Sequence, residues 1–192
     1  MPNARKNKVR FNLKNVHYAP LTGFTGGVPT YDTPIAIPGA VSLSLDPNGE
    51  PENFYADGGV YYVINNNMGY DGDLELAMLT EDFRVYALGE AKDTNNVLVE
   101  KSDNEFKPFA LLFEFDGDVK HIRHVLYNCT ASRPNIEGKT IEENKEVQTE
   151  TVTIAAVPLP DGTVKAKTGD DTDETTYNGW YGSVYQGAGG GD

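Results

Sequence analysis

Hydrophobic and polar residues alternate with a period of two along much of the chain. This alternation is typical of strands that bury one face in an antiparallel sheet. In residues 149–157, for example, Val152, Ile154 and Ala156 share one face while threonines occupy the other. The sequence therefore predicts a mainly β protein, with strands in residues 41–45, 60–64, 74–78 and 149–157 and a further strand residue at Tyr55.

Two turn signals divide these runs. Asp46-Pro47-Asn48-Gly49 is expected to end the first strand, because these residue types favour turns. Asp116-Gly117-Asp118 separates two long apolar runs, 109–115 and 119–130, and predicts a hairpin. At about 3.3 Å per residue, an arm of about twelve residues would span about 40 Å, which suits an extended wall.

One helix is predicted directly after residue 80. Thr80 can cap its start, Glu81 and Asp82 favour the positive end of the helix dipole, and Gly89 can close it. Apolar residues recur at helical spacing over this segment, which favours packing against a sheet.

The remaining organisation is a single body with two extended ends. No internal repeat and no sharp change of composition divides residues 16–168, which we expect to form one mixed β domain with a helix. Residues 1–15 form a basic N-terminal arm. Residues 169–192 comprise an acidic loop (169–176), an aromatic segment (177–185) and a glycine-rich tail (186–192).

Charge is distributed unevenly. The 192-residue chain has a net charge of −13, but residues 1–15 contain five basic residues and no acid, which leaves −18 for the rest. The overall acidity disfavours a protein that grips phosphate backbones. The arm is interpreted as a nucleic-acid tail, a disordered leader, or a strap on the acidic face of a neighbouring copy.

Two groups of residues are candidates for contacts between subunits. The arm offers opposite charge to an acidic neighbour, and the C-terminal aromatics can form either a core or an interface. The candidates are Arg5, Lys6, Lys8, Arg10, Trp180, Tyr181 and Tyr185. If the arm fixes register between copies, deletion of residues 1–12 should shorten or abolish assemblies without unfolding the domain.

Signals for catalysis or cofactor binding are weak. Cys129 is the only cysteine, so no intrachain disulfide can form, and burial as a small apolar side chain is expected. His121 and His124 lie three apart in a strand pattern and should point to opposite faces, which disfavours a shared metal. The Asp71/Asp73 and Asp116/Asp118 pairs are read as turns around glycine, with metal binding or acid–base chemistry as the alternative. We expect no cofactor, no metal and no enzymatic activity.

An ordered set of sequence strings resembles the major tail protein of long-tailed phages of Gram-positive bacteria. The resemblance covers about residues 8–168. The strings are KNVHYA (14–19), TPIAIPGAVSLSLD (33–46), FYAD (54–57), YDGDLE (70–75), LGE (88–90), KPFALLFEFDGD (107–118), HVLYNC (124–129) and QTET (148–151).

The resemblance implies a tail tube subunit. Such proteins are similar to the type VI secretion tube protein: a β-sandwich or partial barrel with one flanking helix, a long hairpin and extended arms. They form stacked hexameric rings in the virion tail, enclose the tape-measure protein, meet tail-tip and tail-terminator proteins, and conduct DNA as transient cargo. No catalytic residues are known for the family.

Two other functions are kept as alternatives. One is a β-sandwich module of a phage tail that binds a carbohydrate or receptor, which aromatics on a concave face would favour. The other is a hydrolase with two carboxylates about 5–10 Å apart in a pocket. No run of about 18 apolar residues and no signal-peptide pattern is present, so synthesis in the host cytoplasm without membrane insertion is expected.

Overall fold

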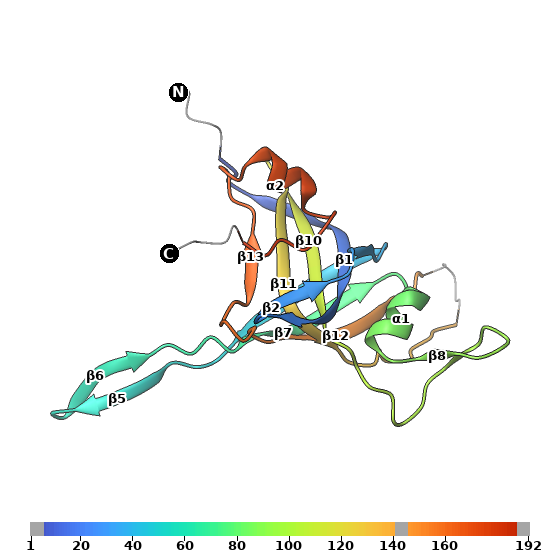
Figure 1. Ribbon diagram of the computed structural model, residues 1–192, viewed down its shortest axis with the longest axis horizontal. Coiled ribbons are helices and arrows are strands. Elements are labelled where there is room, and N and C mark those ends of the chain that lie inside the picture. Colours follow the sequence, from blue (N-terminus) through green and yellow to red (C-terminus); the bar gives the residue numbers. More distant parts are fainter. Residues whose placement is uncertain (1–5, 141–145, 188–192) are drawn as a thin grey trace.

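Antiparallel β-structure dominates the chain (Figure 1), for which a computed structural model describes residues 6–140 and 146–187. The helices are α1 (Glu81–Ala87) and α2 (Glu174–Gly179). The strands are β1 (Arg10–Thr25), β2 (Val28–Tyr31), β3 (Ile35–Ala36), β4 (Ala40–Asn48), β5 (Glu52–Ala56), β6 (Gly59–Ile64), β7 (Gly69–Leu76), β8 (Ala91–Lys92), β9 (Leu98–Val99), β10 (Phe109–Gly117), β11 (Ile122–Ala131), β12 (Glu150–Ala156) and β13 (Lys165–Lys167).

Most strands belong to one sheet. Its main path runs β2-β1-β10-β11-β12-β7-β4, with β3 added beside β1 and β13 beside β11. Every pairing in it is antiparallel. The prediction of a mainly β fold is therefore confirmed, and so is the hairpin of β10 and β11.

The sheet curls around a first hydrophobic core. Strands at both ends of the path contribute to it, because Leu43 and Leu45 of β4 pack on the same cluster as Val16 and Tyr18 of β1. Further buried members are Leu74, Leu76, Phe83, Phe109, Leu111, Phe113, Leu126, Val152 and Ile154. Strand β12 follows its predicted alternation: its apolar side chains are buried and its central threonines are exposed.

Helix α1 covers this core as predicted. The Thr80 hydroxyl accepts a hydrogen bond from the Phe83 amide at 3.3 Å, which satisfies one free donor of the first turn. Phe83 is fully buried and packs edge-on against Tyr18 and Phe109. Gly89 ends the helix at φ +73, where a Cβ would lie 2.7 Å from the Glu105 carbonyl oxygen.

A second core covers the opposite face of the sheet. Leu112 of β10 and Val125 of β11 point away from the first core and pack against Leu159, Trp180 and Val184. Both faces of β10 are thus buried, which explains the uninterrupted apolar run of residues 109–113.

Two predicted turns are wrong, and a third is displaced along the chain. Strand β4 continues through Asp46-Pro47-Asn48, and Pro47 pairs with Tyr70. This is possible because β4 is an edge strand, where a missing N–H need not break the ladder. Asp71-Gly72-Asp73 lies within β7, and a Cβ on Gly72 would meet the Ser44 carbonyl oxygen at 1.9 Å. The β10–β11 turn covers residues 118–121, so Asp116 and Gly117 belong to the strand.

The ends of the body also differ from the prediction. Strand β1 begins at Arg10, so the predicted arm boundary after residue 15 falls inside a paired strand. The predicted acidic loop 169–176 includes the start of α2, whose N-cap Asp173 accepts from the Thr176 amide at 2.9 Å. Met78, predicted in a strand, lies beyond β7 and is exposed.

Candidate assembly surfaces

The hairpin of β5 and β6 projects far from the body (Figure 1). Its turn, Asp57-Gly58, has φ values of +50 and +80, as a two-residue hairpin turn of type I′ requires. Tyr61 is 72% exposed, and the other large apolar residues of both strands are exposed as well: Phe54, Tyr55, Val60, Tyr62, Val63 and Ile64. Contiguous exposed apolar side chains of this kind make the hairpin a candidate interaction surface.

This hairpin was not predicted from the sequence. A strand was expected in residues 60–64, and the Asp57-Gly58 pair just before it is the signal that could have found the turn. The hairpin is also acidic, because the chain has no lysine or arginine between residues 15 and 83 while Glu50, Glu52 and Asp57 flank the aromatics.

Two sheet edges accompany the hairpin. Strands β2 and β4 end the main path of the sheet, and Val28 and Val41 on them are exposed. Edge strands present free N–H and C=O groups to which another chain can add. Pro47 limits such pairing at the end of β4 that leads to the hairpin.

The N-terminal segment is fastened to its own subunit. The Asn7 side chain caps the β10–β11 turn, accepting from the amides of Val119 and Lys120, and the Lys8 amide donates to Asp118 at 2.7 Å. Within β1, Lys14 pairs with Asp116 at 2.7 Å. The side chains of the predicted contact residues Lys6, Lys8 and Arg10 are exposed, whereas Arg5 lies outside the described residues.

The C-terminal aromatics do not share one environment. Trp180 is 2% exposed, stacks on Tyr185, and donates from Nε1 to the His124 carbonyl at 3.3 Å. Of the two alternatives for the C-terminal aromatics, a core or an interface, Trp180 therefore belongs to a core. Its indole has almost no surface left for another subunit. Tyr181 and Tyr185 are half-buried beside it and pack against the second core.

A buried ion pair fastens this segment to the sheet. Glu114 is 2% exposed and accepts from Arg123 Nε at 3.0 Å, from Asn15 at 2.7 Å and from the Tyr181 hydroxyl at 3.3 Å. The Arg123 guanidinium lies 4.0 Å from the ring centroid of Tyr177 and also donates to the Tyr177 carbonyl. Burial, followed by the charge of Glu114, raises the pKa of Tyr181. No local pattern pointed to this network, because its members lie far apart in the sequence.

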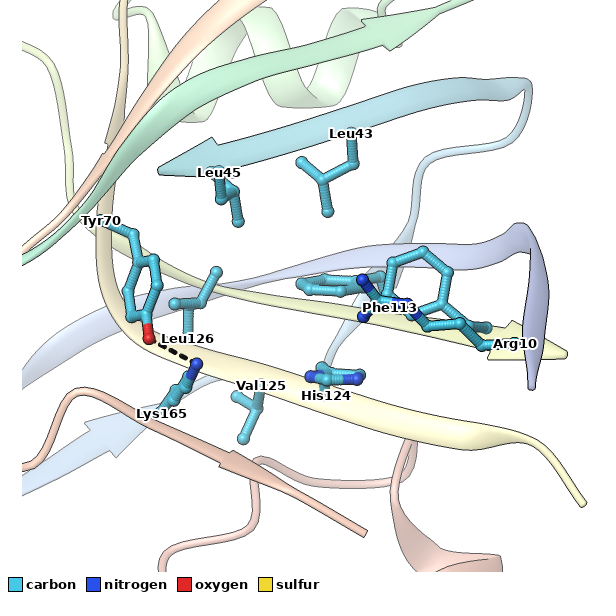
Figure 2. A pocket seen from close by; sticks show the side chains of 10 residues that line it. Arg10, Leu43, Leu45, Tyr70, Phe113, His124, Val125, Leu126 and Lys165 are labelled. Atoms are coloured by element: carbon cyan, nitrogen blue, oxygen red, sulfur yellow. Dashed lines mark hydrogen bonds between the residues drawn. The ribbon is translucent and has the colours of Figure 1, made fainter. Parts of the chain in front are cut away.

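A cleft of about 160 Å³ opens where β4 and β7 face β10 and β11 (Figure 2). Leu43, Leu45, Phe113, Phe115 and Leu126 form its apolar lining. Two cations stand at the cleft: Arg10, whose guanidinium lies 5.0 Å from the Phe115 ring centroid, and Lys165, which donates to the Tyr70 hydroxyl.

His124 lines the same cleft and stacks on Phe113 with an interplanar angle of 3°. Burial, reinforced by the charges of Lys167, Lys165 and Arg10, lowers the pKa of His124 to about 4. The imidazole is therefore neutral at physiological pH and acts as an aromatic wall.

The other titratable candidates serve structural roles. Cys129 is fully buried, and burial raises the pKa of its thiol to about 12, which confirms the apolar interpretation. His121 pairs with Asp116 at 2.7 Å, and Asp73 accepts from Thr153 at 2.9 Å. Within residues 6–140 and 146–187, no group of three or more histidine, cysteine or acidic side chains is arranged to hold a metal ion.

No family model and no curated protein matches the chain. In the described part of the chain, no helix is long and apolar enough to cross a membrane.

Proposed function

We propose that this protein is a structural subunit of a phage tail tube, which self-assembles into stacked hexameric rings. The tube would enclose the tape-measure protein and conduct DNA, with tail-tip and tail-terminator proteins at its ends. The sequence resemblance suggests this role. The main structural support is the projecting β5–β6 hairpin, whose exposed aromatic rings need a partner to leave water.

The free sheet edges support the same proposal. A closed ring can pair or cover every edge strand, and this removes the aggregation hazard that β2 and β4 present in a single copy. The net charge of −13 agrees with a conduit that does not retain DNA, because carboxylates repel phosphates within the screening length of about 8 Å.

The hairpin aromatics also bear on the alternative of a carbohydrate- or receptor-binding module. They lie on a projecting two-stranded ribbon, away from the curled sheet (Figure 1). A ribbon exposed on all sides favours insertion between protein subunits over stacking of a sugar in a concave site.

Negative-stain electron microscopy over a concentration series tests the proposal. The intact chain should form rings or hollow tubes, alone or with tail-tip components as initiator. A variant with Phe54→Ser and Tyr62→Ser should keep its circular dichroism spectrum, because both side chains are exposed in a single copy. It should lose these assemblies, because the exposed rings of the hairpin are the surface that a partner would cover. A chain that stays monomeric at every concentration, with and without initiator, contradicts the proposal.

A further inference from the structure

The cleft beside His124 has the size and lining of a site for one aromatic ring. An apolar cavity of about 150 Å³ is large enough to bind benzene, and the cleft measures about 160 Å³. The cations around it are not neutralised internally: among the described residues, no carboxylate lies within 4.0 Å of Arg10, Lys165 or Lys167. Arg10, Lys165 and Lys167 all act on His124 as positive charges, so the cleft offers a cationic rim to an acidic neighbour.

One face of the β5–β6 hairpin has the complementary chemistry. Phe54 pairs with Tyr62 across the two strands, and Glu52 pairs with Ile64 two residues away. Because side chains two apart on a strand share a face, Glu52 lies on the same side as the Phe54 and Tyr62 rings. These rings are 55% and 63% exposed, so the hairpin does not bury them against its own body.

We propose that the cleft receives one ring of the Phe54–Tyr62 pair from a second copy of this chain, with Glu52 of that copy facing Lys165. The proposal rests on the self-assembly proposed above and names the surface that receives the hairpin. The contact is heterologous, because two different surfaces of the chain meet. Such a contact repeats from copy to copy and generates rings or open stacks.

Charge reversal in the full-length protein tests this pairing. The variants are Lys165→Glu, Glu52→Lys and the double variant, and the matched control is Lys101→Glu, which makes the same charge change at an exposed lysine outside the cleft. Each reversal in the pair should raise the critical concentration for assembly about tenfold or more. The critical concentration of the double variant should return to within about threefold of that of the original chain. The control Lys101→Glu should leave the critical concentration unchanged, and all variants should keep their melting temperatures.

A second measurement does not depend on tubes. In the concentrated, unaltered protein, a zero-length carbodiimide cross-link should join Glu52 of one copy to Lys165 of another, as mapped by mass spectrometry. If tubes form without this cross-link and Lys165→Glu does not change their critical concentration, the pairing is overturned but the proposed function stands. The cross-link in a protein that never forms rings or tubes supports the pairing and overturns the proposed function. Absence of both tubes and cross-link overturns both.

Discussion

Removing either partner of the Glu114–Arg123 ion pair should destabilise the protein far more than removing both. Glu114 is 2% exposed, and the Arg123 side chain keeps only 15% of its surface. Glu114→Gln leaves a buried guanidinium without its counter-charge, and Arg123→Met leaves a buried carboxylate. An uncompensated buried charge costs about 3–5 kcal/mol of unfolding free energy.

The double variant supplies the magnitude of the coupling. With both charges removed, the glutamine that replaces Glu114 can still accept from Asn15, and the methionine that replaces Arg123 keeps apolar volume against the Tyr177 ring. Replacement of a buried pair by groups of similar volume is often nearly neutral, so the double variant should lose less than about 2 kcal/mol. The sum of the losses of unfolding free energy in the two single variants should therefore exceed the loss in the double variant by several kcal/mol. Such a difference is expected for residues in direct contact.

Urea denaturation with two probes measures this cycle. Far-ultraviolet circular dichroism follows the sheet, and the fluorescence of Trp180, the only tryptophan, follows the C-terminal segment. In the single variants the Trp180 transition should precede the circular dichroism transition, because Glu114 and Arg123 bind Tyr181 and Tyr177 of that segment. The control Glu100→Gln breaks the exposed pair with Arg133 and should leave the midpoint unchanged. Single losses below about 1 kcal/mol, or strictly additive losses, would refute the reasoning.

Two further predictions concern the first core and its cleft. Thr80→Ala removes the cap of α1 and should cost about 1 kcal/mol in urea denaturation, with Thr80→Ser restoring most of it; an unchanged midpoint would contradict the role of the cap. Folding lowers the pKa of His124 from 6.5 to about 4. At a pH between these values, the imidazole of the unfolded chain therefore binds a proton more readily than the imidazole of the folded protein. The contribution of the neutral His124 side chain to the free energy of unfolding is complete above pH 6.5. This contribution is lost as the pH falls toward 4, by up to about 3 kcal/mol. His124→Phe should thus lose less stability than the original chain between pH 6.5 and 4, and parallel pH profiles of the two proteins would exclude this effect.

The elements that the sequence predicts well are those whose signals are local. The Thr80 cap, the acidic first turn and Gly89 all act within one helix, so α1 is found where it was expected. Strand β12 and the β10–β11 hairpin follow from alternation and from a long apolar run bounded by turn residues. The wrong turns share one cause, because Pro47 and Gly72 favour turns by themselves but are held in paired strands by their neighbours.

The candidate surfaces depend far more on the tertiary structure. The aromatic residues of 54–64 and of 177–185 look alike in sequence, yet only the second group finds a core of its own chain to pack on. Likewise, the cleft combines Arg10, Leu43, His124 and Lys165 from four different strands. Their spacing in the sequence does not indicate that they lie close together in the fold.

The chain alone therefore specifies a mainly β protein with one capped helix, a central hairpin, an acidic net charge and a single buried cysteine. These properties follow from periodicity, capping and composition, which act between neighbouring residues. Only the tertiary structure decides that Trp180 is buried, that the β5–β6 hairpin is exposed, and that Glu114 meets Arg123. Burial depends on which surfaces the curled sheet brings together, and this is a property of the whole fold rather than of any one segment.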